Sequence, residues 1–240
     1  MPMRPEAFRD FIQVAGVRDL DEARRLLDCG VRYLGFPLRL PVNVEDLPEA
    51  EAAEIIRSIQ PPCYGVAITY QDKADDIADF MDYLGASIVQ LHGEIDLAQL
   101  RHLRRQRPEL GVIKSLVVGE QSERELAAMA QRLGECADAF ITDTYDPVTG
   151  ASGATGRVHD WGVSRRLVEI APKPVILAGG LTPENVREAI LAVRPAGVDV
   201  HTGVEDATGR KDAARVRRFV AEARAGFELL RSSVGDRPLC

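Results

Sequence analysis

Short apolar segments alternate with amphipathic helical patterns along the sequence, and this alternation limits the possible folds more than any other feature. Eight segments are too short and too continuously apolar for helices and are predicted to be buried strands. They lie at residues 11–15, 33–38, 63–69, 87–91, 112–116, 138–143, 175–178 and 197–200. Strands of this kind are typical of a parallel sheet that is covered on both faces.

Helical patterns follow the strands, at residues 20–28, 49–58, 73–84, 95–106, 122–133, 162–170 and about 212–227. Between the last two strands, Thr182 is expected to cap a helix whose first residue is Pro183. Eight strand–helix units at intervals of roughly 20–30 residues favour closure into a barrel over an open sheet. The prediction is an α/β protein with a single (β/α)8 TIM barrel at 1–230 and a flexible C-terminal tail at 231–240.

Composition and charge limit the classes of function. The chain is 45% hydrophobic and 28% charged, which suits a globular protein with a large core. A formal net charge of −7 without a basic stripe excludes a nucleic acid or an anionic membrane as the expected partner. Four scattered cysteines without a CxxC pair indicate reduced thiols in a cytoplasmic protein. The oligomeric state, monomer or homodimer, is not determined by the sequence.

A phosphate-binding site is predicted where the last two strands end. The run VILAGGL places Gly179 and Gly180 after one strand, and GVDVHTGVE places Thr202 and Gly203 after the next. Glycines let the backbone approach an anion, and backbone N–H groups supply partial positive charge. In TIM barrels the phosphate site usually lies after strands seven and eight. A loop with Gly153, Thr155 and Gly156 has the composition of a further anion contact or a lid.

Active sites in this fold lie at the carboxyl ends of the strands, although only every other strand residue points inward. We expect the substrate to contact a set of residues at or near these ends: Gln13, Ala15, Arg39, Gln90, Lys114 and His201. Asp143 ends an apolar strand and is the first candidate for acid–base catalysis, because burial there raises a carboxyl pKa towards neutrality.

Other strand ends allow more than one role. Asp199 could hold a substrate hydroxyl or amine, or make a structural hydrogen bond. Histidine is the residue type suited to acid–base catalysis near neutral pH, but an equally common role for a lone strand-end histidine such as His92 is a hydrogen-bonded wall. Lys114 could form a Schiff base if desolvated or could neutralise substrate charge, and His201 could reach the phosphate pocket. No Ser–His–Asp order and no metal-ligand cluster stands out in the sequence.

Several runs, in order along the chain, match one known family. They are VRYLGF at 31–36, YGVA at 64–67, VQLHGE at 89–94, ITDT at 141–144, GATGRVHDW at 153–161, LAGGLTPENV at 177–186 and VDVHTGVEDATGRKD at 198–212. From residue 11 to about 227 the chain resembles phosphoribosylanthranilate isomerase. The resemblance implies an Amadori rearrangement in tryptophan biosynthesis, in which an aminoaldose phosphate becomes a 1-amino-1-deoxyketose phosphate without cofactor or metal.

The resemblance also implies roles for individual residues. Asp143 matches the general acid that protonates the ring oxygen, and Asp199 matches an aspartate near the substrate amine. The phosphate is then expected on the backbone around Gly179-Gly180 and Thr202-Gly203, with help from the loop at 153–156.

The sequence departs from this family at functional positions. The family opens with Lys-Ile-Cys-Gly, whose cysteine is the general base, but Ala15 stands at that position here and none of the four cysteines is placed to replace it. Where the family has an arginine for the anthranilate carboxylate, the nearest residues are Glu45 and Asp46, so that only Arg39 could compensate. His201 and its neighbour Thr202 replace two serines.

Three functions therefore remain open. The chain could isomerise phosphoribosylanthranilate or a related phosphosugar, with Asp143 acting alone or with His92 or Asp199. It could instead be a phosphosugar-binding barrel without catalytic activity. The third possibility is a lyase that works through a Schiff base on Lys114.

Overall fold

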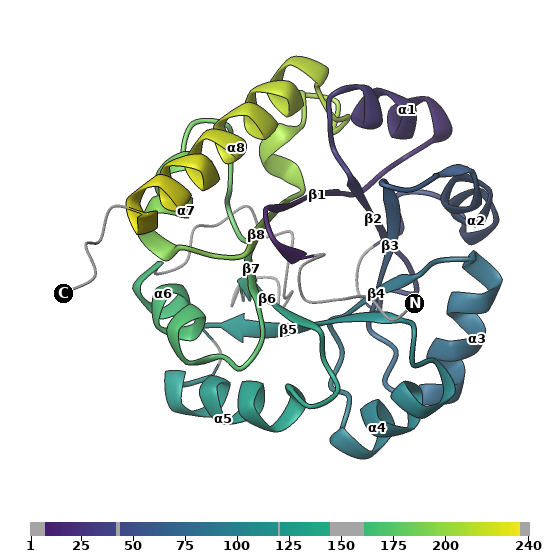
Figure 1. Ribbon diagram of the computed structural model, residues 1–240. Helices are drawn as coiled ribbons and strands as arrows, with labels where there is room; N and C mark the ends of the chain where they lie inside the picture. Colours follow the sequence, from purple (N-terminus) through teal and green to yellow (C-terminus); the bar gives the residue numbers. More distant parts are fainter. Residues whose placement is uncertain (1–7, 42–43, 120, 145–160, 236–240) are drawn as a thin grey trace.

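The computed structural model describes residues 8–41, 44–119, 121–144 and 161–235. Within them, eight parallel strands close into one barrel in sequence order, with helices around it (Figure 1). The strands are β1 (Phe11–Ala15), β2 (Tyr33–Pro37), β3 (Tyr64–Thr69), β4 (Ile88–Leu91), β5 (Gly111–Val118), β6 (Ala139–Thr144), β7 (Val175–Leu177) and β8 (Gly197–Val200). The predicted (β/α)8 barrel is confirmed.

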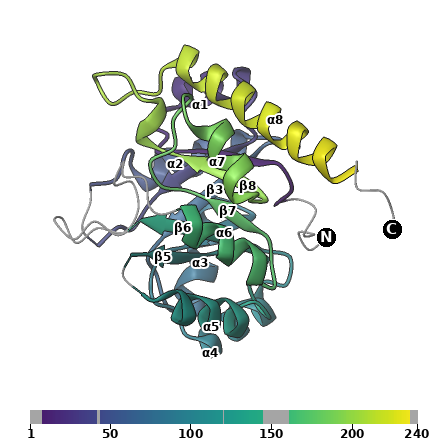
Figure 2. The same ribbon diagram turned by 90° about the vertical axis from the view of Figure 1, so that its left-hand side faces the viewer.

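The helices are α1 (Leu20–Asp28), α2 (Glu49–Ser58), α3 (Ala74–Leu84), α4 (Leu97–Gln106), α5 (Glu123–Leu133), α6 (Trp161–Ile170), α7 (Val186–Val193) and α8 (Ala213–Gly235). A 3-10 turn, η2 (Thr202–Val204), follows β8. Figure 2 shows the barrel from the side, with the segment after β8 at the left-hand end and the C-terminal end of α8 directed to the right.

Two predicted helix boundaries are wrong. Helix α7 begins at Val186, because Thr182 and Pro183 belong to a preceding turn in which the Thr182 hydroxyl accepts a hydrogen bond from the N–H of Glu184. Helix α8 continues to Gly235, so residues 231–235, expected in a flexible tail, are helical. Residues 236–240 lie outside the described residues.

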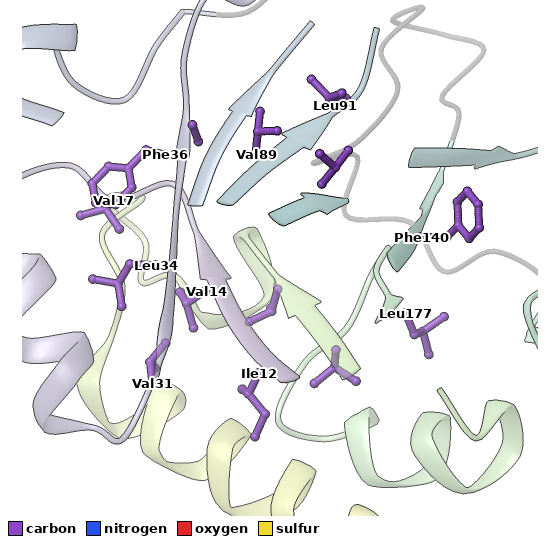
Figure 3. Close-up of a cluster of buried hydrophobic side chains, with 14 of the residues drawn as sticks. Ile12, Val14, Val17, Val31, Leu34, Phe36, Val89, Leu91, Phe140 and Leu177 are labelled. Atoms are coloured by element: carbon purple, nitrogen blue, oxygen red, sulfur yellow. The ribbon is translucent and has the colours of Figure 1, made fainter. Parts of the chain in front are cut away.

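Alternation along the strands separates two hydrophobic cores. Residues such as Ile12, Val14 and Leu34 point outward and pack beneath the helices (Figure 3). A second cluster fills the barrel interior and includes Phe11, Val66, Ile88, Ile113, Ile141 and Ile176. The inward positions are thus known for each strand, and they determine which polar side chains can reach the barrel mouth.

Aromatic rings close the amino-terminal end of the barrel. Phe8 and Phe11 are fully buried with ring centroids 5.8 Å apart, Phe11 stacks on Tyr33 at 3.9 Å, and Tyr33 stacks on Tyr64 at 5.8 Å. Because Phe11, Tyr33 and Tyr64 each begin a strand, this cluster lies opposite the carboxyl ends of the strands. We call these four residues the aromatic floor.

Candidate active site

Five polar side chains from four strands converge at the carboxyl end of the barrel interior. Gln13 lies on the inward face of β1, two residues from the inward-facing Phe11 and Ala15. The same alternation directs the other four inward: Gln90 on β4, His92 just after it, Asp143 on β6 and Asp199 on β8. Four of the five were predicted to end strands, and Gln13 was predicted near the end of the first.

Hydrogen bonds and one ion-pair contact connect these side chains one after another. The Gln13 amide donates to Oε1 of Gln90 at 2.9 Å, and Nε2 of Gln90 lies 2.6 Å from Nε2 of His92. On the other edge of that ring, Nδ1 of His92 lies 2.8 Å from Oδ2 of Asp143. This is an ion-pair distance, although the ring N–H is not aligned with the oxygen as in a hydrogen bond. The sequence placed both residues at strand ends but did not show that they pair.

Asp199 is at the other end of the row, beside Gln13. The two residues are direct partners in the β1–β8 ladder, and Gln13 donates a hydrogen bond to the carboxylate. Desolvation nevertheless raises the pKa of Asp199 from 3.8 to about 6. Its Oδ1 atom is buried without a hydrogen-bond partner among the described residues. Asp199 is therefore a carboxyl group that can change protonation near neutral pH.

Lys114 leaves β5 on the face opposite to these residues. Alternation places it on the same face of β5 as Val112 and Leu116, which pack in the outer core. Its amine donates to the carbonyl oxygen of Ser115 at 2.9 Å and to the Ser115 hydroxyl at 3.0 Å. Burial lowers the pKa of Lys114 to about 8, although Asp143 and Glu94 favour the charged form. The amine is thus held within the protein, which is unfavourable to the predicted substrate contact.

The segments predicted to bind phosphate follow the adjacent strands β7 and β8. Gly179 and Gly180 have φ angles of 98° and 62°, a region that suits glycine. A Cβ atom on Gly203 would lie 1.8 Å from the carbonyl oxygen of Leu181, so the two strand ends touch and only glycine fits between them. Within the described residues, the N–H groups of Gly179 and Gly180 have no acceptor. These donors can bind an anion. Gly153, Thr155 and Gly156 lie outside the described residues.

Arg39 is held by residues of α2 and α3. Its guanidinium bonds both carboxylate oxygens of Glu49 on α2, at 2.8 and 3.2 Å, and lies 3.8 Å from the ring centroid of Phe80 on α3. Freeing the side chain for a substrate carboxylate would break all these contacts. The expected role of Arg39 as a substrate contact stays a prediction.

His201 lies against β1, and its predicted contacts with substrate and phosphate stay predictions. A Cβ atom built on Gly16 would be 2.2 Å from Nε2 of His201, so the imidazole covers the backbone directly after Ala15. Three charged groups surround the ring: Asp46, Glu205 and Lys211. The sequence did not reveal this cluster, although the pairing of the first and last strands of a barrel could have indicated that His201 and Ala15 are neighbours.

Neither a membrane-spanning helix nor a cluster of metal ligands is found within the described residues. No helix among them is long and apolar enough to span a membrane. No group of three or more His, Cys, Asp or Glu side chains in the same ranges is arranged to hold a metal ion.

Known proteins resemble this chain in sequence over most of its length. The sequence profile of N-(5'-phosphoribosyl)anthranilate (PRA) isomerase matches residues 12–222. The chain belongs to the PRA isomerase family. A PRA isomerase of Methanocella arvoryzae is 39% identical over 214 residues, covering 89% of this chain and 97% of that protein. PRA isomerase 2 of Methanosarcina mazei is 35% identical over 223 residues, covering 92% of this chain and 97% of the relative.

Solved PRA isomerase structures share the barrel. The enzyme from Thermotoga maritima has a TM-score of 0.76 at 28% identity, covering 90% of this chain and 99% of that one. Another PRA isomerase has a TM-score of 0.74 at 26% identity with the same coverage, and it was crystallised with reduced 1-(o-carboxyphenylamino)-1-deoxyribulose 5-phosphate. That ligand combines a phosphate, a sugar chain and an aromatic amine in one molecule.

Proposed function

We propose that this protein catalyses an Amadori rearrangement of a phosphoribosyl amine, with N-(5'-phosphoribosyl)anthranilate as the first candidate substrate. Family membership and the names of its relatives support this class of reaction. The observation that carries the proposal is the pairing of Asp143 with His92, because it holds a buried carboxyl group at the mouth of the barrel. The converging ends of β7 and β8 provide a place for the substrate phosphate.

The chemistry needs an acid, a base and no external oxidant. Asp143 donates a proton to the ring oxygen, the bond from C1 to that oxygen breaks, and the nitrogen lone pair forms a C1=N iminium. A base then removes the C2 proton, and the electron pair of that C–H bond produces an enolamine. Tautomerisation yields the 1-amino-1-deoxyketose. Because oxidation at C2 balances reduction at C1 within one molecule, the reaction requires no redox cofactor.

In this reaction His92 is a positioning residue. Gln90 and Asp143 engage its two ring nitrogens, so the imidazole holds the Asp143 carboxyl in place instead of meeting the substrate. The phosphate binds to the N–H groups at Gly179 and Gly180 and to the adjacent η2 turn. The amine of Lys114 is hydrogen-bonded to Ser115, and it forms no covalent bond with the substrate in this scheme.

The test is turnover of N-(5'-phosphoribosyl)anthranilate, followed by loss of its fluorescence, in the wild type and in Asp143→Asn. We expect the wild type to turn over and the variant to lose about 10²–10⁴-fold in kcat. Asp76→Asn, which alters an exposed carboxylate on α3, serves as the matched control and should retain wild-type activity.

Two results would contradict the proposal. Retention of activity by Asp143→Asn would remove the assigned acid. A wild type that binds ribose 5-phosphate but does not turn over would instead indicate a phosphosugar-binding barrel.

A further inference from the structure

The inference concerns which group removes the C2 proton, and it rests on the proposed function. The inward face of β1 ends at Ala15, whose methyl group cannot exchange protons. In the β1–β8 ladder Gln13 pairs with Asp199 and Val14 pairs with Val200. Strand β8 ends at Val200, and His201 follows it directly.

The contact at Gly16 shows how closely the ring approaches this position. Gly16 has a φ angle of +81°, and the Cβ of any other residue would meet Nε2, Cε1 and Cδ2 of His201 at 2.2, 2.6 and 2.9 Å. The imidazole therefore lies across the end of β1, with Nε2 nearest to the Gly16 backbone. A proton acceptor reaches the level of Ala15 from the neighbouring strand.

The opposite edge of the ring is oriented by the protein. Nδ1 of His201 lies 3.3 Å from Oε1 of Glu205, and Lys211 donates from Nζ to the His201 carbonyl oxygen at 3.0 Å. Lys211 also pairs with Glu205, so carboxylate and lysine hold each other beside the ring. When Nδ1 donates to Glu205, the neutral imidazole has its lone pair on Nε2, on the edge of the ring that faces Asp46 and the end of β1.

The charges around the ring suit it to accept a proton. They come from Glu205 and Lys211 after β8, and from Asp46 before α2, whose Oδ2 lies 3.6 Å from Nε2. Burial alone would lower the pKa of His201, and Lys211 acts in the same direction, but the two carboxylates raise it overall. They stabilise the imidazolium that proton transfer would produce.

The other titratable groups at the described part of the barrel mouth are placed differently from His201. Both ring nitrogens of His92 face partners, and Asp143 serves as the acid. Asp199 is bonded to Gln13, one inward position deeper than Ala15 along the same ladder. His201 alone among them presents a nitrogen at the level of Ala15.

We propose that His201 is the general base, taking the C2 proton on Nε2 while Glu205 positions the ring from Nδ1. The C2–H bond breaks, and its electron pair becomes the C1–C2 double bond of the enolamine as the iminium nitrogen is neutralised. Asp143 and His201 then act from β6 and from the end of β8, so acid and base stand on different parts of the barrel wall.

The deciding experiment combines His201→Gln with Ala15→Cys. His201→Gln keeps a polar side chain without a proton acceptor of suitable pKa and should lower kcat about 10²–10⁴-fold. Binding of inorganic phosphate should change less than threefold. Adding Ala15→Cys should restore part of the lost kcat, because the thiolate occupies the same level of the barrel mouth. His102→Gln on α4 is the matched histidine control and should be silent.

The pH profile separates catalysis from structure. In the wild type, kcat should rise with pH as His201 loses its proton, and Glu205→Gln should move that rise to lower pH because a carboxylate favouring the imidazolium is removed. In His201→Gln/Ala15→Cys the rise should instead follow a thiol, whose ordinary pKa is about 8.5. A deuterium isotope effect with C2-deuterated substrate reports directly on proton removal.

The outcomes distinguish this inference from the function on which it rests. If His201→Gln keeps kcat within threefold while Asp143→Asn loses it, the function stands and His201 is not the base. If the wild type is inactive and Ala15→Cys alone creates activity, His201 again does not supply the base. If neither protein turns over, the proposed function fails and the inference with it.

Discussion

The position of one proton on His92 follows from the orientation of two side-chain amides. Since Gln13 donates to Oε1 of Gln90, the NH₂ group of Gln90 faces Nε2 of His92, which must accept. A neutral His92 then carries its proton on Nδ1, toward Asp143. Because hydrogen positions follow from the bonding pattern, reversing either amide would reverse this tautomer. The two glutamines thus act on Asp143 through the tautomer of His92.

Asp199→Asn should stabilise the fold at neutral pH. With a pKa of about 6 in the folded protein against 3.8 ordinarily, the carboxyl has no effect below about pH 4. Above about pH 6 its ionisation opposes folding by up to roughly 3 kcal/mol. Asparagine keeps a polar group beside Gln13 and never ionises. Urea unfolding should therefore show a larger advantage of the variant at about pH 8 than at about pH 4, and an equal difference at both would contradict the shift.

Strand ends were sufficient to find the inward polar residues, because alternation in a parallel barrel is regular. Gln90, His92, Asp143 and Asp199 could all be selected in this way. Partners that come from loops could not. The sequence did not reveal that Arg39 pairs with Glu49, and the charges around His201 come from segments whose paths the sequence does not determine.

At the level of elements, strand positions were easier to predict than helix starts. Thr182 and Pro183 form a good capping sequence, yet the Asn185 side chain accepts from the Thr182 N–H and donates to the Gly180 carbonyl. These bonds stabilise a turn at the end of β7, and helix α7 begins only after it. The side-chain bonds of the turn therefore prevail over the local preference for a helix cap.

The buried carboxylate of Glu22, on α1, accepts a hydrogen bond from the segment after β8. Glu22 is fully buried and accepts from the Arg18 N–H at 2.9 Å and from the Lys211 N–H at 3.0 Å. Glu22→Gln would set an amide NH₂ against one of these donors, and we expect a loss of about 1–3 kcal/mol in the free energy of unfolding. Denaturant titration measures it. Glu54→Gln, on the exposed side of α2, should change stability by less than about 0.5 kcal/mol, and an equally small effect at Glu22 would show that these bonds contribute little.

For the whole molecule, the sequence was informative because the two cores have different periodicities. Outward strand residues and helix faces form one core, and inward residues form the other. Eight repeats of this pattern leave few alternatives to closure, so the fold was predictable from the order of segments. The side-chain contacts between the first and last strands, such as that of His201 with the end of β1, were not predictable in this way.

The aromatic floor should support stability without affecting catalysis. Phe11 is fully buried between Phe8 and Tyr33, and Phe11→Ala should lower the free energy of unfolding by about 3–5 kcal/mol. Since the floor lies at the opposite end from the barrel mouth, kcat and KM of the folded protein should stay near wild type. Chemical denaturation and steady-state kinetics test both parts, with Leu229→Ala, half-exposed on α8, as control. A large change in KM would contradict this separation.

The ladder between β1 and β8 also has a consequence for synthesis of the chain. A ribosome releases β1 before β8, so this seam cannot form until all eight strands have emerged. Until then β1 has one open edge, and Ala15 and Gly16 face no imidazole. A nascent or truncated chain that lacks β8 therefore lacks both the closed wall and the imidazole beside Gly16, and the protein acquires the two together.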